Sequence, residues 1–261
     1  MAYDYETLKV VVEDGVAVVA LNRPEKFNAL NKKMLAELRP CFEELGLDAE
    51  VKVVVLTGTG KAFCAGGDVE EMGKGMLKLD YSGGRFLGKT MQAISGLEKP
   101  VICAMNGIAA GGGAGAVLAC DMIFASEKAK FSEIYTNIGM VPDMGNMWYL
   151  ARAVGPYKAK ELCFSHELID AAEMLRIGIA QKVFPAEELM PKTLEYAKNL
   201  AKGPSVAYKM LKTIIDRGWG MSFEQFYDLE AFALEIVMQT EDFQEGCDAF
   251  FQKRAAVYKG K

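Results

Sequence analysis

The stretch VKVVVLTGTGKAFCAGGDVEEM, residues 51–72, decides the fold class. It opens with a run of β-branched residues over 51–60, which is typical of a strand buried on both faces of a parallel sheet. A glycine-rich turn over 62–72 follows that strand directly. Because buried strands that alternate with helices build layered α/β folds, the stretch predicts an α/β protein.

A second segment of the same kind, PVICAMNGIAAGGGAGAVLAC, spans residues 100–120. We expect a buried strand over 100–109 and a helix that opens at the glycines 111–113. Residues 101–120 carry no charge, and a run of that length suits a membrane span. Five glycines and Asn106 within the run favour a strand, a turn and a tightly packed helix instead.

The rest of the chain divides into an α/β part, 1–185, and a helical C-terminal region, 186–261. In the first part we expect strands over 15–24, 121–126 and 130–133, a helix over 31–46 that Pro40 kinks or restarts, a helix over 84–97, and short helices within 146–178. In the second part we expect helices over 186–201, 205–217, 222–240 and 243–258.

The apolar residues of the expected helix 222–240 exceed a single helical stripe, which indicates burial on two sides and a subunit interface. They are Phe223, Phe226, Tyr227, Leu229, Phe232, Leu234, Ile236 and Val237.

The composition of the 261 residues is that of an ordinary soluble globular protein, with 51% apolar and 25% charged residues. A formal net charge of −5 argues against a general nucleic-acid binder. The six cysteines form no CxxC pair, and most sit in apolar runs, which favours reduced thiols in a cytoplasmic protein. The acidic N-terminus lacks the continuous apolar stretch of a signal peptide.

The single histidine, His166, excludes most histidine-clustered metal sites, and we expect no bound metal. The phosphate-binding P-loop and the dinucleotide-binding GxGxxG motif are both absent from the sequence. The 26 glycines gather instead at the two turns that follow the buried strands. Such turns expose backbone N–H groups, which can stabilise an anion or a developing oxyanion.

Five segments together resemble the crotonase superfamily, the enoyl-CoA hydratases and isomerases. They are LNRPEKFNAL (21–30), VVLTGTGKAFCAGGDVEEM (54–72), KPVICAMNGIAAGGG (99–113), DMIFASEKAKF (121–131) and EGCDAFFQKR (245–254). The resemblance implies a spiral of ββα units, a helical C-terminal region used for trimerisation, and homotrimers or homohexamers. It also implies a coenzyme A thioester as substrate and no separate cofactor.

By position, the resemblance implies that the backbone N–H groups of Gly67 and Gly112 form the oxyanion hole for the thioester carbonyl. Each such donor is worth about 3–4 kcal/mol in comparable enzymes. The resemblance further implies that coenzyme A is held by Lys26, Ala62, Ala65, Asp68 and Val69, and by Lys253 from a neighbouring subunit. The simpler interpretation of the two lysines is a solvated surface position.

The sequence departs from the family pattern at the two catalytic glutamates of the hydratases, which match Gly115 and Tyr135 here. The resemblance therefore does not predict hydration by two carboxylates at these positions. Glu133 is close to Tyr135 in sequence, but its alignment does not fit the usual role.

A carboxylate stands instead at Asp143, in VPDMGNMWYL (141–150), where the family usually has glycine. From sequence physics alone, Asp143 is interpreted as the N-cap of the following helix. The resemblance favours a catalytic aspartate, because the ring-epoxide phenylacetyl-CoA isomerases are nearly the same there. The 4-chlorobenzoyl-CoA dehalogenases also carry this aspartate, but they need an upstream histidine, and His166 is interpreted as a loop residue.

We therefore expect an enoyl-CoA double-bond isomerase in which Asp143 removes a proton at C4 or C2 and returns it at the other carbon. Apolar neighbours would raise the pKa of this base, and Tyr135 would bind substrate or line the pocket. One alternative is a hydratase of enoyl-CoA or cyclic dienoyl-CoA. Another is a non-catalytic homologue that binds acyl-CoA.

Overall fold

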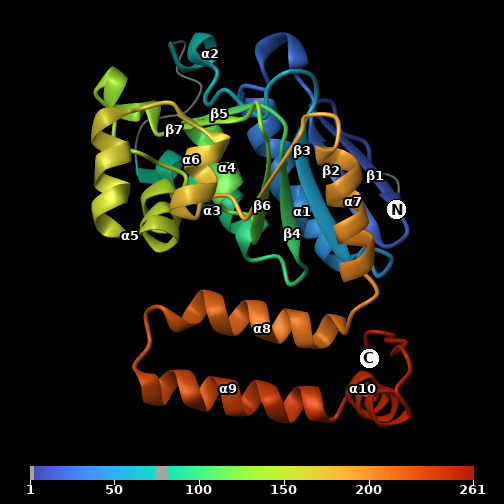
Figure 1. Cartoon of the computed structure of the whole chain (residues 1–261). Coiled ribbons are helices and arrows are strands. Elements are labelled where there is room, and N and C mark those ends of the chain that lie inside the picture. Colours follow the sequence, from blue (N-terminus) through green and yellow to red (C-terminus); the bar gives the residue numbers. More distant parts are fainter. Residues whose placement is uncertain (1–2, 74–80) are drawn as a thin grey trace.

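A six-stranded sheet forms the centre of the computed structural model, which describes residues 3–73 and 81–261. Its strand order is β1-β2-β3-β4-β6-β9, and every neighbouring pair is parallel except β1 and β2. The strands are β1 (Leu8–Glu13), β2 (Val16–Leu21), β3 (Val53–Gly58), β4 (Val101–Met105), β6 (Met122–Ser126) and β9 (Lys182–Phe184). Figure 1 shows the sheet with its helices.

The inner strands have the character predicted from their continuous apolar runs. All five residues of β4 are buried, and in β3 only the terminal Gly58 is not fully buried. The edge strand β1 differs, because only Leu8 is buried and exposed residues alternate with partly buried ones along the rest of it. It pairs with β2 through a tight hairpin at Asp14 and Gly15, both of which have positive φ. This strand had no counterpart among the predicted elements.

The prediction of one strand over 100–109 is wrong, because the chain leaves the main sheet after β4. A second sheet has the order β5-β7-β8, made of β5 (Ile108–Ala110), β7 (Lys130–Ser132) and β8 (Ile169–Asp170). At the break between the strands, a Cβ on Gly107 would overlap the carbonyl oxygen of Lys61. Glycine therefore allows the chain to switch sheets directly after Asn106, at a close approach of two backbones.

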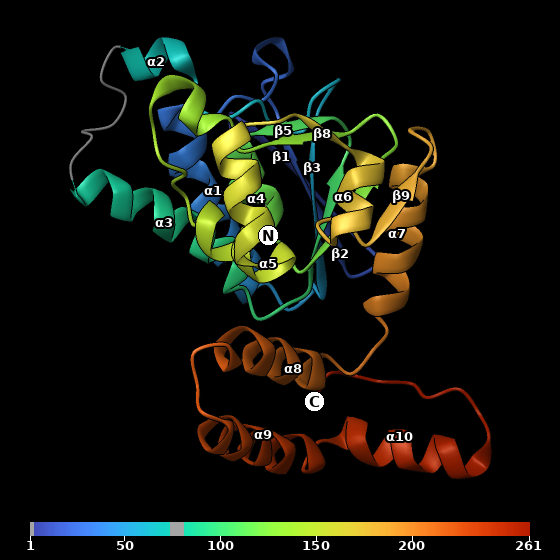
Figure 2. The same ribbon diagram turned by 60° about the vertical axis from the view of Figure 1, so that its left-hand side comes forward.

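Helices cover both faces of the main sheet (Figure 2). One face packs against α1 (Lys32–Leu47), α3 (Tyr81–Ser95), α4 (Gly112–Leu118) and α5 (Asn146–Ser165). The other face packs against α7 (Leu189–Leu200), whose Leu189 and Ala197 join a cluster with Val53 and Ile102. The prediction that 186–201 is helical is confirmed, and this helix belongs to the packing of the sheet.

Helices α1 and α5 each contain a proline, and its effect differs between them. Helix α1 runs continuously through Pro40, so the predicted restart is wrong. The Asn31 side chain caps the start of this helix by accepting from Met34 N at 2.9 Å. Helix α5 consists of two helical stretches that meet at a kink at Gly155, just before Pro156, which confirms the short helices expected within 146–178. The helix α6 (Ala171–Ile177) follows β8.

The last three helices form a separate layer below the α/β part in Figure 1. They are α8 (Ser205–Gly218), α9 (Phe223–Met238) and α10 (Glu241–Gln252). The ion pairs Lys209–Glu98 at 2.5 Å and Lys212–Asp121 at 2.8 Å join α8 to the α/β part. Helix α10 ends six residues before the predicted end at 258, because Lys253 adopts a left-handed conformation and caps it.

Large apolar side chains of these helices lie exposed in the single chain. Phe223 and Phe232 of α9 are 82% and 62% exposed, and Phe250 and Phe251 of α10 are about equally open. The chain alone therefore does not provide the two-sided burial expected for α9. A subunit interface over these residues stays a prediction.

None of the helices within the described ranges combines the length and apolar character that crossing a membrane requires. The charge-free run 101–120 forms β4, β5 and α4, as its glycines indicated. All six cysteines are free thiols, and four of them are buried.

Candidate functional site

The two glycine-rich turns meet at one place in the structure. The loop after β3 runs beside β5, where Ala110 N donates to Cys64 O at 3.0 Å and Cys64 forms a bridge with Ala109. A Cβ on Gly66 would lie 2.9 Å from the carbonyl oxygen of Ala110. Because its φ is also 104°, Gly66 is a position that only glycine fits. The contact between Gly66 and Ala110 brings the first glycine-rich turn against the start of the second turn.

The two predicted oxyanion donors flank this contact. Within residues 3–73 and 81–261, neither Gly67 N–H nor Gly112 N–H has a hydrogen-bond partner in the protein. Gly112 is the first residue of α4 and is buried. Both N–H groups are therefore available to a ligand that carries an oxygen.

Apolar side chains stand close over both glycines. A Cβ on Gly67 would lie 2.8 Å from Met72 Sδ, and a Cβ on Gly112 would lie 2.7 Å from Met144 Sδ and 2.9 Å from Leu30 Cδ1. Any larger residue at either position would thus displace a methionine. The same side chains give the surroundings of the two N–H groups an apolar, low-dielectric character.

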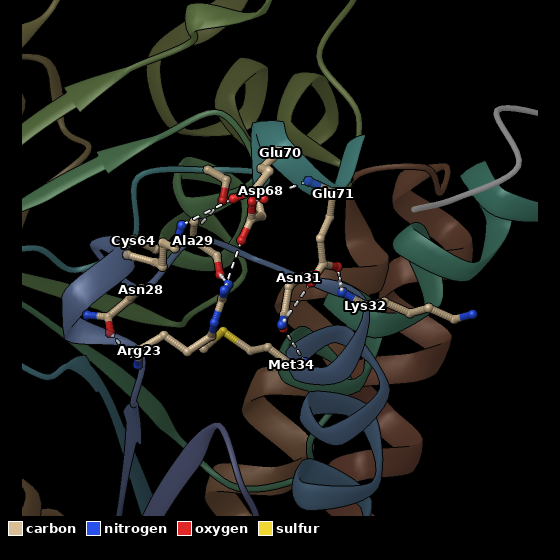
Figure 3. Close-up of polar contacts among 12 residues, drawn as sticks. Arg23, Asn28, Ala29, Asn31, Lys32, Met34, Cys64, Asp68, Glu70 and Glu71 are labelled. Carbon is tan, nitrogen blue, oxygen red and sulfur yellow. Dashed lines mark hydrogen bonds and ion pairs between the residues drawn. The ribbon is translucent and has the colours of Figure 1, made fainter. Parts of the chain in front are cut away.

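Asp68 is fixed by an arginine that sequence reasoning missed. Its Oδ2 accepts from Arg23 Nη2 at 2.8 Å, and both side chains are largely buried, as Figure 3 shows. Burial raises the pKa of Asp68, but the hydrogen bond and charge of Arg23 outweigh it and hold the pKa below its usual value. The Asp68 carboxylate thus already has a protein partner. The simplest contact of Asp68 with a ligand is therefore through its backbone groups.

The other residues expected to hold coenzyme A lie around this ion pair. Ala65 is exposed and donates its N–H to Phe27 O at 3.0 Å. Val69 is 77% exposed and begins α2 (Val69–Gly73). Lys26 is half exposed and bonds Glu70 at 3.3 Å. Ala62 is buried, and its carbonyl accepts from Asn28 Nδ2 at 2.9 Å.

Helix α2 is held against the start of α1 by Glu71. Its carboxylate accepts from the Asn31 side chain at 3.3 Å and from Lys32 N at 3.1 Å, as Figure 3 shows. Lys253 lies elsewhere, because it caps α10, which Figure 1 places at the opposite end of the molecule from α2. Its expected contribution from a neighbouring subunit stays a prediction.

Asp143 forms a hydrogen bond with Tyr135 instead of capping a helix. Tyr135, in the short 3-10 helix η2 (Ile134–Ile138), donates from Oη to Asp143 Oδ1 at 2.6 Å. The N-cap of α5 is Gly145, so the interpretation of Asp143 as that cap is wrong. Burial raises the pKa of Asp143, and the Tyr135 hydroxyl offsets part of the rise.

Asn146 connects this pair to the glycine turn. Its Nδ2 donates to Tyr135 Oη at 3.0 Å, to Asp143 O at 2.9 Å and to Gly111 O at 3.4 Å. A Cβ on Gly115 would lie 2.9 Å from the same Nδ2. Asn146 therefore occupies the space beside the position where the resemblance places a hydratase glutamate, a role that its sequence position did not indicate.

Glu133 lies beside these residues and is 1% exposed. Within the described residues neither oxygen of its carboxyl group has a hydrogen-bond partner. Burial raises the pKa of Glu133 to about 8, and the negative charge of Asp143 adds to the rise. The structure thus places a second carboxyl close to Asp143, although the sequence alignment gave it no role.

His166 is exposed at the C-terminal end of α5, which confirms its interpretation as a loop residue. Its contact with the site is indirect, since its backbone carbonyl accepts from Ser132 Oγ at 2.9 Å. No group of three histidine, cysteine, aspartate or glutamate side chains within 3–73 and 81–261 is arranged to hold a metal ion.

Free N–H groups beside a buried carboxyl are the arrangement of an enzyme that stabilises an oxyanion next to an acid or base. The chain belongs to the enoyl-CoA hydratase/isomerase family, whose model matches residues 12–261. The predicted α/β crotonase fold with a helical C-terminal region is confirmed by a crystal structure of enoyl-CoA hydratase from Bacillus anthracis. That structure has a TM-score of 0.93 and 33% identity, with 98% of this chain and 100% of that chain covered.

Two curated relatives represent the two activities of the family. The short-chain-enoyl-CoA hydratase of Clostridium acetobutylicum is 39% identical over 93% of this chain and 93% of its own length. The 1,2-epoxyphenylacetyl-CoA isomerase of Escherichia coli is 32% identical over 96% of this chain and 97% of its own length. The chain is thus similar to both hydratases and isomerases of acyl-CoA thioesters, and it is an enzyme of this superfamily.

Proposed function

We propose that the protein is an enoyl-CoA double-bond isomerase in which Asp143 is the acid and base. The observation that carries the proposal is the 2.6 Å hydrogen bond between Tyr135 and Asp143 beside the Gly111–Gly112 turn. A carboxylate held by one neutral donor next to an oxyanion hole suits transfer of a proton between two carbons of one substrate.

In this proposal the thioester carbonyl binds the N–H groups of Gly67 and Gly112. Asp143 removes a proton from C4 or C2, the negative charge collects on the thioester oxygen, and the two N–H groups stabilise it. Asp143 then returns the proton at the other carbon, so the double bond moves and the site regains its starting state. Tyr135 remains neutral throughout, because burial and the charge of Asp143 raise its pKa.

The acyl group lies against Leu30, Met72 and Met144, whose side chains stand over the two glycines. The CoA moiety follows the rim formed by Lys26, Ala62, Ala65, Asp68 and Val69, with Lys253 supplied by another subunit of a trimer or hexamer. The exposed aromatic residues of α9 and α10 support such an assembly. Titrating Lys26→Gln with coenzyme A tests the rim: Kd rises if Lys26 binds it and is unchanged if the lysine is only a surface residue.

A second candidate function is hydration of an enoyl-CoA, and the Glu133 carboxyl favours it. Hydration uses one group to orient water and another to deliver the proton, and Glu133 supplies a second carboxyl next to Asp143. Hydratases also predominate among the named relatives, including the crotonyl-CoA hydratase of Syntrophomonas wolfei.

Turnover in heavy-oxygen water separates the two functions. Linear 3-enoyl-CoA and cyclic dienoyl-CoA are incubated with the protein, and the products are analysed by mass spectrometry. Isomerisation gives a product of unchanged mass without the heavy label. A product that has gained labelled water contradicts the isomerase proposal and identifies a hydratase.

A further inference from the structure

Glu133 is a buried ionisable group near the site that the proposed reaction leaves unused. It lies directly after β7, two residues before Tyr135, and is 1% exposed. Both of its carboxyl oxygens lie out of reach of solvent and of hydrogen-bond donors within the described residues. An ionised carboxylate without a partner is very unfavourable in such a place, so the group is held as the neutral acid.

Among the described residues, the ionisable groups that interact electrostatically with Glu133 are one carboxyl, one phenol and one thiol. Tyr135 belongs to the same segment, Asp143 comes from the loop before α5, and Cys163 comes from α5 itself. Within the residues that the structure describes, Glu133 forms no ion pair. Each of these neighbours therefore disfavours a negative charge on Glu133 or is neutral.

The contrast with Glu37 shows what a buried ionised carboxylate requires in this fold. Glu37 is also buried, but its oxygens accept from Thr7 N at 2.9 Å, from Thr7 Oγ1 at 2.6 Å and from Glu6 N at 3.1 Å. Lys33 adds an ion pair at 3.3 Å. Burial raises the pKa of Glu37, but these donors outweigh it and lower the pKa. Among the residues that the structure describes, Glu133 has no comparable set of donors.

We infer that Glu133 is a positioning residue that shares one negative charge with Asp143, staying neutral itself so that the charge resides on the base. The inference rests on the proposed function of Asp143. Two carboxyls in one buried compartment cannot both ionise easily, and they titrate as a coupled pair. Loss of the proton from Glu133 would place a like charge beside Asp143. This second charge would oppose the negative charge that collects on the thioester oxygen, and protonated Asp143 would hold its proton more tightly and return it more slowly as the acid.

The pH dependence of isomerisation tests this inference in the full-length protein. Wild-type kcat/KM is expected to fall about tenfold between pH 7 and pH 9, because the Glu133 pKa lies near 8 and each unit of pH above it changes the neutral fraction tenfold. In Glu133→Gln and in the apolar Glu133→Met this fall is absent. The matched control Glu37→Gln loses stability but keeps the wild-type fall.

A second measurement reads the charge of Glu133 without turnover. The difference infrared spectrum between wild type and Glu133→Gln at pH 7 is expected to contain the C=O stretch of a protonated carboxylic acid, which disappears near pH 8. An ionised Glu133 at pH 7, or the same alkaline fall in both Glu133 variants, overturns the inference. A protein that shows the band but does not isomerise any enoyl-CoA contradicts the proposed function while supporting a neutral Glu133.

Discussion

The Tyr135 hydroxyl donates a 2.6 Å hydrogen bond to Asp143 Oδ1, and the same hydroxyl accepts from Asn146 Nδ2 at 3.0 Å. The tyrosine therefore holds the carboxylate from one side and is itself fixed by the amide that reaches Gly111. A base that must act beside an oxyanion hole needs such orientation, because small displacements of a reacting group reduce the rate strongly.

Tyr135→Phe removes the donor and leaves the aromatic ring in place. Because the Tyr135 hydroxyl lowers the pKa of Asp143 against the effect of burial, its loss raises that pKa further. We expect the acid limb of the kcat/KM profile to move to higher pH, and kcat to fall about 10- to 100-fold. Steady-state isomerisation between pH 5 and 8 measures both effects.

Tyr157→Phe is the matched control for this variant, since Tyr157 lies on α5 and is 87% exposed. Its profile should coincide with that of the wild type. An unchanged acid limb in Tyr135→Phe would show that the hydroxyl does not act on Asp143.

Gly115→Ala is expected to destabilise the protein by about 1–3 kcal/mol, because its Cβ meets Asn146 Nδ2 at 2.9 Å and Met144 Cβ at 3.2 Å. Urea unfolding measures the change. In an Asn146→Ala background the same substitution should be less costly, since the amide is gone. Gly84→Ala on α3 is the control, because its Cβ would meet no atom within 4 Å.

Equal destabilisation by Gly115→Ala with and without Asn146 would contradict the packing described for this position. It would place the strain in the backbone of α4 instead.

The stability of the protein should decrease with rising pH because of Glu133. The pKa of this group is near 8 in the folded protein and near 4.5 when unfolded. A raised pKa in the folded state gives stability that is fully present below pH 4.5 and lost as pH rises through 8. The expected slope is about 1.4 kcal/mol per pH unit between these values.

Denaturant unfolding of wild type and Glu133→Met at pH 5 and pH 8 measures this contribution. The unfolding free energy of Glu133→Met minus that of the wild type should be larger at pH 8 than at pH 5. A difference that is the same at both pH values would show that Glu133 titrates alike in the folded and unfolded states.

Arg23→Met should cost about 3 kcal/mol of stability, because it leaves the largely buried Asp68 carboxylate without its partner. Adding Asp68→Asn should recover most of the loss, which urea unfolding of the double variant measures. Arg39→Met is the control, since the Arg39–Glu43 pair is exposed and should contribute about 0.5 kcal/mol or less. A loss as small as that of the control would mean that Arg23 does not stabilise Asp68.

The parts of the fold predicted correctly are those specified by local sequence. Continuous apolar runs produced β3 and β4, and the glycines after them produced the two turns. The break between β4 and β5 was missed because one apolar run spans both strands, and the sheets diverge only where Gly107 meets Lys61.

The site was predicted in part for a similar reason. The glycine turns and Asp143 were predicted from motifs, whereas the contacts of Arg23 and Asn146 and the burial of Glu133 depend on the folded chain and are not visible in the sequence. Arg23 reaches Asp68 across 45 residues, and Asn146 reaches Gly111 across 35. The chain must fold before these pairs exist, so their roles follow from the structure.

The central claim is that Asp143 moves the proton, and Asp143→Asn tests it most directly. We would measure the Kd for an acyl-CoA and the single-turnover rate of enoyl-CoA isomerisation for this variant and the wild type. The control is Asp170→Asn, which keeps a side chain able to cap α6. The account predicts an unchanged Kd and a rate lowered at least about 1,000-fold in Asp143→Asn alone. Isomerisation at the wild-type rate by Asp143→Asn, with normal binding, would contradict it.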